Sequence, residues 1–115
     1  MLSKKRRVGR HLFNKIFPKT RISSTDFFTV RFVESEKKKE TRFSIIVSKK
    51  ISKTAVGRNL IRRRVSRVLE IMRGRIAHSY IVLIYCKKNT HNAPFAILEK
   101  EVERSLLKIG ILDVG

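Results

Sequence analysis

The longest run of regularly spaced apolar residues lies between residues 54 and 73. Spacings of three and four positions place these residues on one side of a helix, so the pattern predicts a long amphipathic helix over this segment. Gly74 suits its end, because glycine readily adopts the left-handed conformation that closes many helices. The predicted buried stripe comprises Ile61, Val65, Val68, Leu69 and Met72, with Ile76 beyond the helix.

Two shorter helices are predicted near the ends of the chain. One runs from His11 to Phe17 and ends at Pro18, because the residue before a proline is driven out of helical geometry. The other covers residues 94–109, where Pro94 suits the first turn. Its predicted buried stripe comprises Phe95, Leu98, Val102, Leu106 and Ile109.

Three segments have the pattern of β-strands. Residues 27–33 and 42–48 alternate apolar and polar side chains, and the polar residues 34–40 between them predict an antiparallel hairpin. Residues 80–86 are apolar throughout, which predicts a central strand covered on both faces. The linker 48–53 is a candidate for an additional short strand.

The order of these elements predicts an α+β sandwich around one sheet. A chain of 115 residues suits a single domain over residues 1–115. Residues 1–10 are strongly basic and are expected to form a flexible N-terminal segment.

The charge of the chain points to a polyanionic partner. Lys and Arg number 28 against 9 Asp and Glu, a formal net charge of +19. Self-repulsion of this size opposes a compact state unless a polyanion neutralises it. Nucleic acid is the usual polyanion, and an acidic membrane surface is the alternative. Because there is one cysteine, Cys86, and neither a secretory signal nor an apolar run of spanning length, we expect a cytoplasmic protein without a membrane partner.

The predicted long helix carries arginines on the side opposite its apolar stripe. Asn59, Arg62, Arg63, Ser66, Arg67 and Arg73 occupy this side. Like charges four residues apart, as in Arg58 with Arg62 and Arg63 with Arg67, destabilise an isolated helix. The planar guanidinium group binds two phosphate oxygens at once. The pattern therefore favours nucleic-acid binding over an ordinary solvated helix face.

The sequence favours RNA over DNA as the nucleic-acid partner. The sequence has neither a helix-turn-helix arrangement nor zinc-ligand spacing. Instead, Phe13 and Phe17, four positions apart, could stack unpaired bases beside the sheet. The alternative is that both phenylalanines simply pack the first helix on the core.

No catalytic constellation is predicted. Glu99 and Glu103 are a helical pair of acids but lie beside cations, and His11, His78 and His91 are in three separate segments. A nuclease acting alone would need clustered carboxylates for metal ions or a pair of histidines. We therefore expect neither catalytic residues nor a protein metal site in this chain.

The segment SKKISKTAVGRNLIRRRVSRVLE resembles the signature region of the protein subunit of bacterial ribonuclease P. Ser48, Lys49 and Lys50 match its turn, Arg58 and Asn59 its helix opening, and Ile61, Arg62 and Arg63 the continuation. Leu60 and Ser66 stand where the family usually has arginine. The predicted RNA-binding residues are Lys49, Lys50, Lys53, Arg58, Asn59, Arg62, Arg63 and Arg67.

The resemblance implies a mixed sheet with a left-handed βαβ crossover, a sandwich fold also found in a ribosomal protein domain. It implies the accessory subunit of an endoribonuclease, in which a catalytic RNA and its Mg²⁺ ions remove the 5′ leader of precursor tRNA by hydrolysis. The basic helix would bind that RNA, and a leader-binding cleft would include Phe13, Phe17, Phe28 and Val30. A ribosomal or other structural RNA-binding protein is the alternative; it would sediment with ribosomal subunits. A DNA-compacting or membrane-surface protein also fits the charge.

Overall fold

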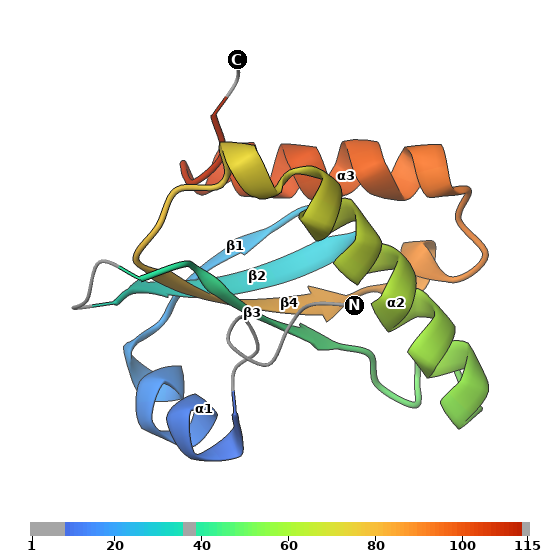
Figure 1. Cartoon of the computed structure of the whole chain (residues 1–115). Coiled ribbons are helices and arrows are strands. Elements are labelled where there is room, and N and C mark those ends of the chain that lie inside the picture. The colour runs from blue at the N-terminus through green and yellow to red at the C-terminus, as the bar shows by residue number, and fades with distance from the viewer. Residues whose placement is uncertain (1–8, 36–38, 114–115) are drawn as a thin grey trace.

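In the computed structural model, residues 9–35 and 39–113 are described, and they form three α-helices and four strands (Figure 1). In chain order the elements are α1 (Arg10–Ile16), β1 (Arg21–Ser24), β2 (Phe28–Glu34), β3 (Arg42–Ile46), α2 (Ala55–Ile71), β4 (Tyr80–Cys86) and α3 (Phe95–Lys108). Short 3-10 turns follow α1, α2 and β4 at Phe17–Lys19, Arg73–Arg75 and Lys88–Thr90. Of the segment 1–10, which was expected to be flexible, residues 1–8 lie outside the described part of the chain, and Arg10 belongs to α1.

The strands form one mixed sheet in the order β1-β2-β4-β3. Neighbours are antiparallel except β3 and β4, which are parallel. The predicted central strand over residues 80–86 is confirmed, but the predicted hairpin of β2 with β3 is wrong because β4 lies between them. The apolar β4 takes the interior position since both of its faces become covered. Strand β1 was not predicted, because its four residues are mostly exposed and polar.

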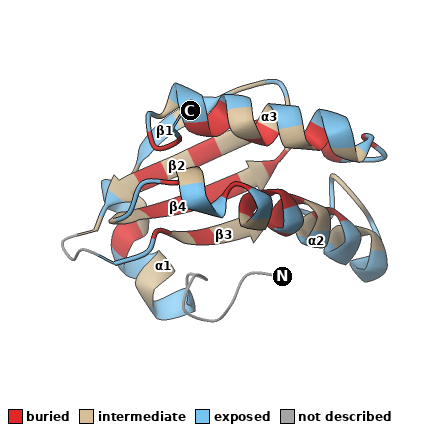
Figure 2. Cartoon of the chain, turned by 45° about the horizontal axis from the view of Figure 1, so that its top comes forward, coloured by how far each residue is buried: buried red, intermediate tan, exposed pale blue. Residues whose placement is uncertain are grey.

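The connection from β3 to β4 determines the handedness of this topology. The chain leaves β3, passes through α2 and returns in β4, parallel to and directly beside β3. In Figure 2, where α2 lies in front of the sheet and both strands point to the right, β4 lies above β3. This arrangement is the left-handed crossover that the family resemblance implies, an exception to the usual right-handed rule. The linker 48–53 forms a turn, with the Ile51 amide donating to the Ser48 carbonyl at 3.0 Å, so the additional strand suggested there is wrong.

The main core lies between one face of the sheet and the helices α2 and α3. The predicted stripe of α2 is buried there, together with alternate residues of β2 and β3 (Figure 2). Of the predicted α3 stripe, Leu98, Val102 and Leu106 are buried, whereas Phe95 and Ile109 at its ends are only partly buried. The β2 contribution consists of Phe28, Val30 and Phe32. Ser66, predicted on the outer side of the long helix, is 3% exposed. Its small side chain borders the apolar stripe, so packing against neighbouring elements covers it.

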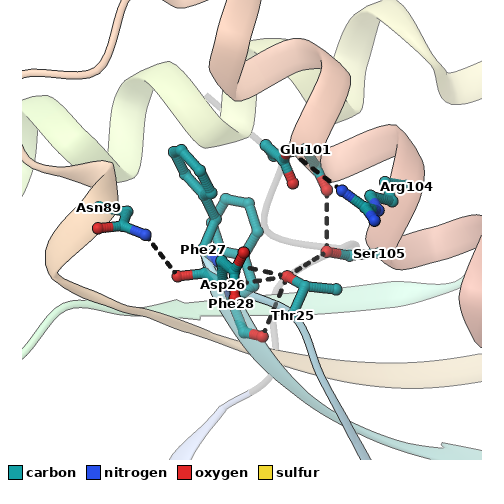
Figure 3. Close-up of polar contacts among 8 residues, drawn as sticks. All are labelled: Thr25, Asp26, Phe27, Phe28, Asn89, Glu101, Arg104 and Ser105. Carbon is teal, nitrogen blue, oxygen red and sulfur yellow. Dashed lines mark hydrogen bonds and ion pairs between the residues drawn. The ribbon is translucent and has the colours of Figure 1, made fainter.

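A polar network attaches the β1–β2 turn to the rest of the sandwich (Figure 3). The Thr25 hydroxyl accepts a hydrogen bond from the Phe28 amide at 3.2 Å and lies 3.3 Å from the hydroxyl of Ser105 on α3. On the other side of the turn, the Asn89 side chain donates to the Asp26 carbonyl at 3.1 Å. These bonds satisfy polar groups of the turn and fix α3 over the edge of the sheet.

Candidate RNA-binding surface

The basic turn before α2 is folded back against the start of the helix. Thr54 is the N-cap residue, and its side chain accepts a hydrogen bond from the Gly57 amide at 3.0 Å. One nitrogen of Arg58 donates to the carbonyls of Ser52 and Lys53, each at 3.0 Å. A Cβ atom at residue 57 would collide with the Ser52 hydroxyl, so glycine permits this close approach. Part of the hydrogen-bonding capacity of Arg58 therefore holds the turn.

All eight predicted RNA-binding residues lie on this turn and on the first four turns of α2. Lys49, Lys50, Lys53, Asn59, Arg63 and Arg67 are exposed, whereas Arg58 and Arg62 are half-buried. Arg62 donates a hydrogen bond to the side-chain oxygen of Asn59. The ion pairs of Arg73 with Glu40 and of Arg75 with Glu103 lie beyond the C-terminal end of α2. The structure thus brings the predicted residues together as one basic surface, which we call the α2 surface.

A second candidate surface lies on the other face of the sheet, which α1 partly covers (Figure 1). The rings of Phe13 and Phe17 stack with centroids 5.5 Å apart. The guanidinium of Arg31, on β2, lies 4.4 Å from the centroid of Phe17 and donates to the Thr20 hydroxyl at 3.3 Å. Both phenylalanines are half-buried and lie outside the main core. They form an aromatic column with Arg31 instead of filling the core between sheet and helices.

The prediction that Phe28 and Val30 line a leader-binding cleft is wrong. Their side chains are 0% and 2% exposed and pack in the main core under α2 and α3. Successive side chains of a strand point to opposite faces of the sheet, so Thr29 and Arg31, the residues before and after Val30, lie on the opposite face, where α1 is. The alternation of apolar and polar residues in the sequence could have shown this, because it places Phe28 and Val30 on the apolar side of the strand, which packs in the core.

Cross-strand pairing shows what else lies on the α1 face. One row of paired residues runs across all four strands: Ser24, Thr29, Tyr85 and Ile46. Burial raises the pKa of Tyr85, and the nearby Arg31 guanidinium opposes this shift only in part. The phenol therefore stays protonated at neutral pH and can donate a hydrogen bond. Sequence reasoning missed Arg31 and Tyr85, since only the sheet order places them beside α1.

A hollow of about 340 Å³ lies at one end of the α1 face, where β2 ends and β3 and β4 begin. Its walls include the cations Lys15, Lys39 and Arg42 and the acids Glu34 and Glu40, together with Leu12, Tyr80 and Ile81. At the other end, β3 leads directly into the turn that carries Lys49 and Lys50. The α1 face therefore has mixed charge at the hollow and lysines at its other end, where β3 connects it along the chain to the α2 surface.

The described residues contain no cluster of three or more His, Cys, Asp or Glu side chains that could hold a metal ion. Cys86 is buried in the main core, and this burial raises the pKa of its thiol to about 12 against a smaller opposite effect of Arg62. A thiol in this state is a poor nucleophile. Within the same part of the chain, no helix has the length and apolar character to cross a membrane.

The architecture is that of a small α+β sandwich with a left-handed crossover, a basic helix and an aromatic-lined sheet face. A family model for ribonuclease P matches residues 1–110. The chain belongs to the ribonuclease P protein family, whose members are the accessory protein subunits of this bacterial endoribonuclease. The family resemblance inferred from the signature segment is thereby confirmed, and nothing favours a ribosomal protein.

Solved structures agree with this assignment at the level of the fold. The ribonuclease P protein of Staphylococcus aureus is 19% identical with a TM-score of 0.84, over 96% of this chain and 100% of that one. The ribonuclease P protein of Thermotoga maritima is 20% identical with a TM-score of 0.79, over 89% of this chain and 96% of that one. No curated protein sequence matches the chain.

Proposed function

We propose that the α2 surface binds the catalytic RNA of ribonuclease P. The observation that carries this proposal is the convergence of eight predicted cationic and amide side chains on one turn and one helix face. Arginine forks and lysine ammonium groups bind phosphate oxygens, and each phosphate neutralised releases condensed counterions. The association is therefore expected to weaken steeply as salt is raised.

We further propose that the α1 face binds the single-stranded 5′ leader of precursor tRNA. Phe13 and Phe17 offer aromatic surface to unpaired bases, which stack without sequence preference. Arg31 and Tyr85 add a cation and a hydrogen-bond donor on the same face. They replace Phe28 and Val30 in this role, because those two side chains are enclosed by the core.

The hydrolysis itself is assigned to the RNA. Described residues of the protein offer no cluster of metal ligands, so they do not fit a protein-bound Mg²⁺ site, and we assign Mg²⁺ to the RNA and the substrate. The role of the protein is to neutralise phosphates and to position the leader. As a tRNA-processing subunit, the protein is expected to act in the cytoplasm.

Reconstitution tests both assignments. The protein is mixed with a bacterial ribonuclease P RNA at low Mg²⁺, and leader removal is followed for one precursor with a long leader and one with a single-nucleotide leader. We expect stimulation with the RNA and no cleavage by the protein alone. Phe17→Ala should weaken binding of the long-leader precursor and leave the single-nucleotide leader unaffected. Cleavage without RNA, or equal loss on both precursors, would contradict the proposal.

A further inference from the structure

A shallow hollow of about 360 Å³ opens on the outer side of the first turns of α2, lined by Val56, Asn59, Arg62 and Arg63. Val56 is 77% exposed, the largest fraction among the exposed large apolar side chains of the described residues. A single exposed valine is ordinary on a protein surface. Here, however, it shares a concave site with an amide and two guanidinium groups, which are the side chains that bind nucleic acid.

The amide of Asn59 is oriented by its neighbour. Its oxygen accepts a hydrogen bond from Arg62, which leaves the two N–H groups of the amide to donate elsewhere. A donor of this kind suits the acceptor atoms on the edge of a nucleobase. The amide could also donate to a phosphate oxygen, as asparagine side chains do at nucleic-acid backbones. The exposed Val56, however, has no group that binds phosphate, so a phosphate backbone alone does not explain its place in the hollow.

We propose that this hollow receives an unpaired nucleotide of the RNA partner. The base packs on Val56, the Asn59 amide donates to an acceptor on the base edge, and Arg62 and Arg63 bind the adjoining phosphates. This inference rests on the proposed RNA-binding role of the α2 surface and adds that the surface recognises a base.

Charge and shape select this occupant. The chain carries a net charge of +19, and two of the four described residues that line the hollow are arginines, so an anionic partner is favoured over an apolar protein segment. An A-form duplex buries the base edges of its deep groove, whereas loops and bulges splay bases outward. An unpaired nucleotide is therefore the RNA element that can present a base face, a base edge and phosphates together.

Salt titration distinguishes the base contact from the phosphate contacts. Affinity for a bacterial ribonuclease P RNA is measured from low to high salt for the wild type, Val56→Ser, Arg63→Ala and Ile71→Ser. Val56→Ser should lower the affinity about fivefold at every salt concentration, the size expected from burying part of a valine side chain, with an unchanged salt slope. Ile71→Ser is the matched control, because Ile71 is also a β-branched, 52% exposed residue of α2 but lies about 22 Å further along the helix.

Chemical probing of the RNA completes the test. An unpaired base protected by the wild type and released by both Val56→Ser and Asn59→Ala would support the inference. Unchanged affinity of Val56→Ser, with a reduced slope for Arg63→Ala, would overturn the base contact and leave the proposed function standing. No effect of either variant would overturn both. Self-association of the protein without RNA, abolished by Val56→Ser, would instead make the hollow an interface between two copies and overturn the inference.

Discussion

Replacing Arg63 with alanine should weaken RNA binding without weakening the fold. Arg63 is exposed and lies opposite the buried stripe of α2, which includes Ile61 and Val65. Losing a charge-assisted hydrogen bond to phosphate costs about 1.5 kcal/mol, which is roughly tenfold in affinity at low salt. The stability should change by less than about 0.5 kcal/mol, since exposed substitutions seldom exceed this value.

The salt dependence gives a second, independent magnitude. Removing one phosphate contact lowers the slope of log affinity against log salt by about 0.9. The ratio of wild-type to variant affinity should therefore shrink by roughly 3.5-fold when salt rises from about 50 to about 200 mM. Filter binding or fluorescence anisotropy at four salt concentrations, with thermal melts of both proteins, measures these quantities. Parallel salt plots for the two proteins would refute the phosphate contact.

Arg58→Ala tests the structural role that Arg58 has in addition to its proposed place in the α2 surface. The substitution removes hydrogen bonds to the carbonyls of Ser52 and Lys53, so it should destabilise the protein by about 1–2 kcal/mol. A melting temperature lowered by about 4–8 °C is expected for a domain of this size. A melting temperature equal to that of Arg63→Ala would show that the turn does not depend on Arg58.

Three further outcomes are expected. A double-mutant cycle of Phe17→Leu and Arg31→Ala should give a coupling free energy of about 0.5–1 kcal/mol in thermal or urea unfolding, and additivity would refute the cation–π contact. Ile61→Asp should lower the free energy of unfolding by at least about 3 kcal/mol, because Ile61 is 3% exposed, and a native-like melt would show that α2 packs on another face. Cys86 should resist alkylation at pH 8 until the protein unfolds, and rapid labelling of the native protein would contradict its burial. Because burial raises the pKa of this thiol from 9.0 to about 12, the free energy of unfolding should fall as the pH rises between these two values.

The sequence by itself determined the helices, the central strand and the composition of the α2 surface. A period of 3.6 residues identifies the buried stripe of α2, and a local charge pattern identifies its outer arginines, so both follow from neighbours along the chain. The signature residues from Ser48 to Arg63 identified the family for the same reason, since they lie within one short segment.

Only the tertiary structure decided which strands are neighbours and therefore what lies on the α1 face. The insertion of β4 between β2 and β3 depends on contacts far apart in sequence, so the hairpin suggested by local alternation did not form. The same sheet order encloses Phe28 in the core and places Arg31 and Tyr85 beside α1. Alternation along a strand divides its residues between two faces, but which face meets the helices and which stays open is settled by packing.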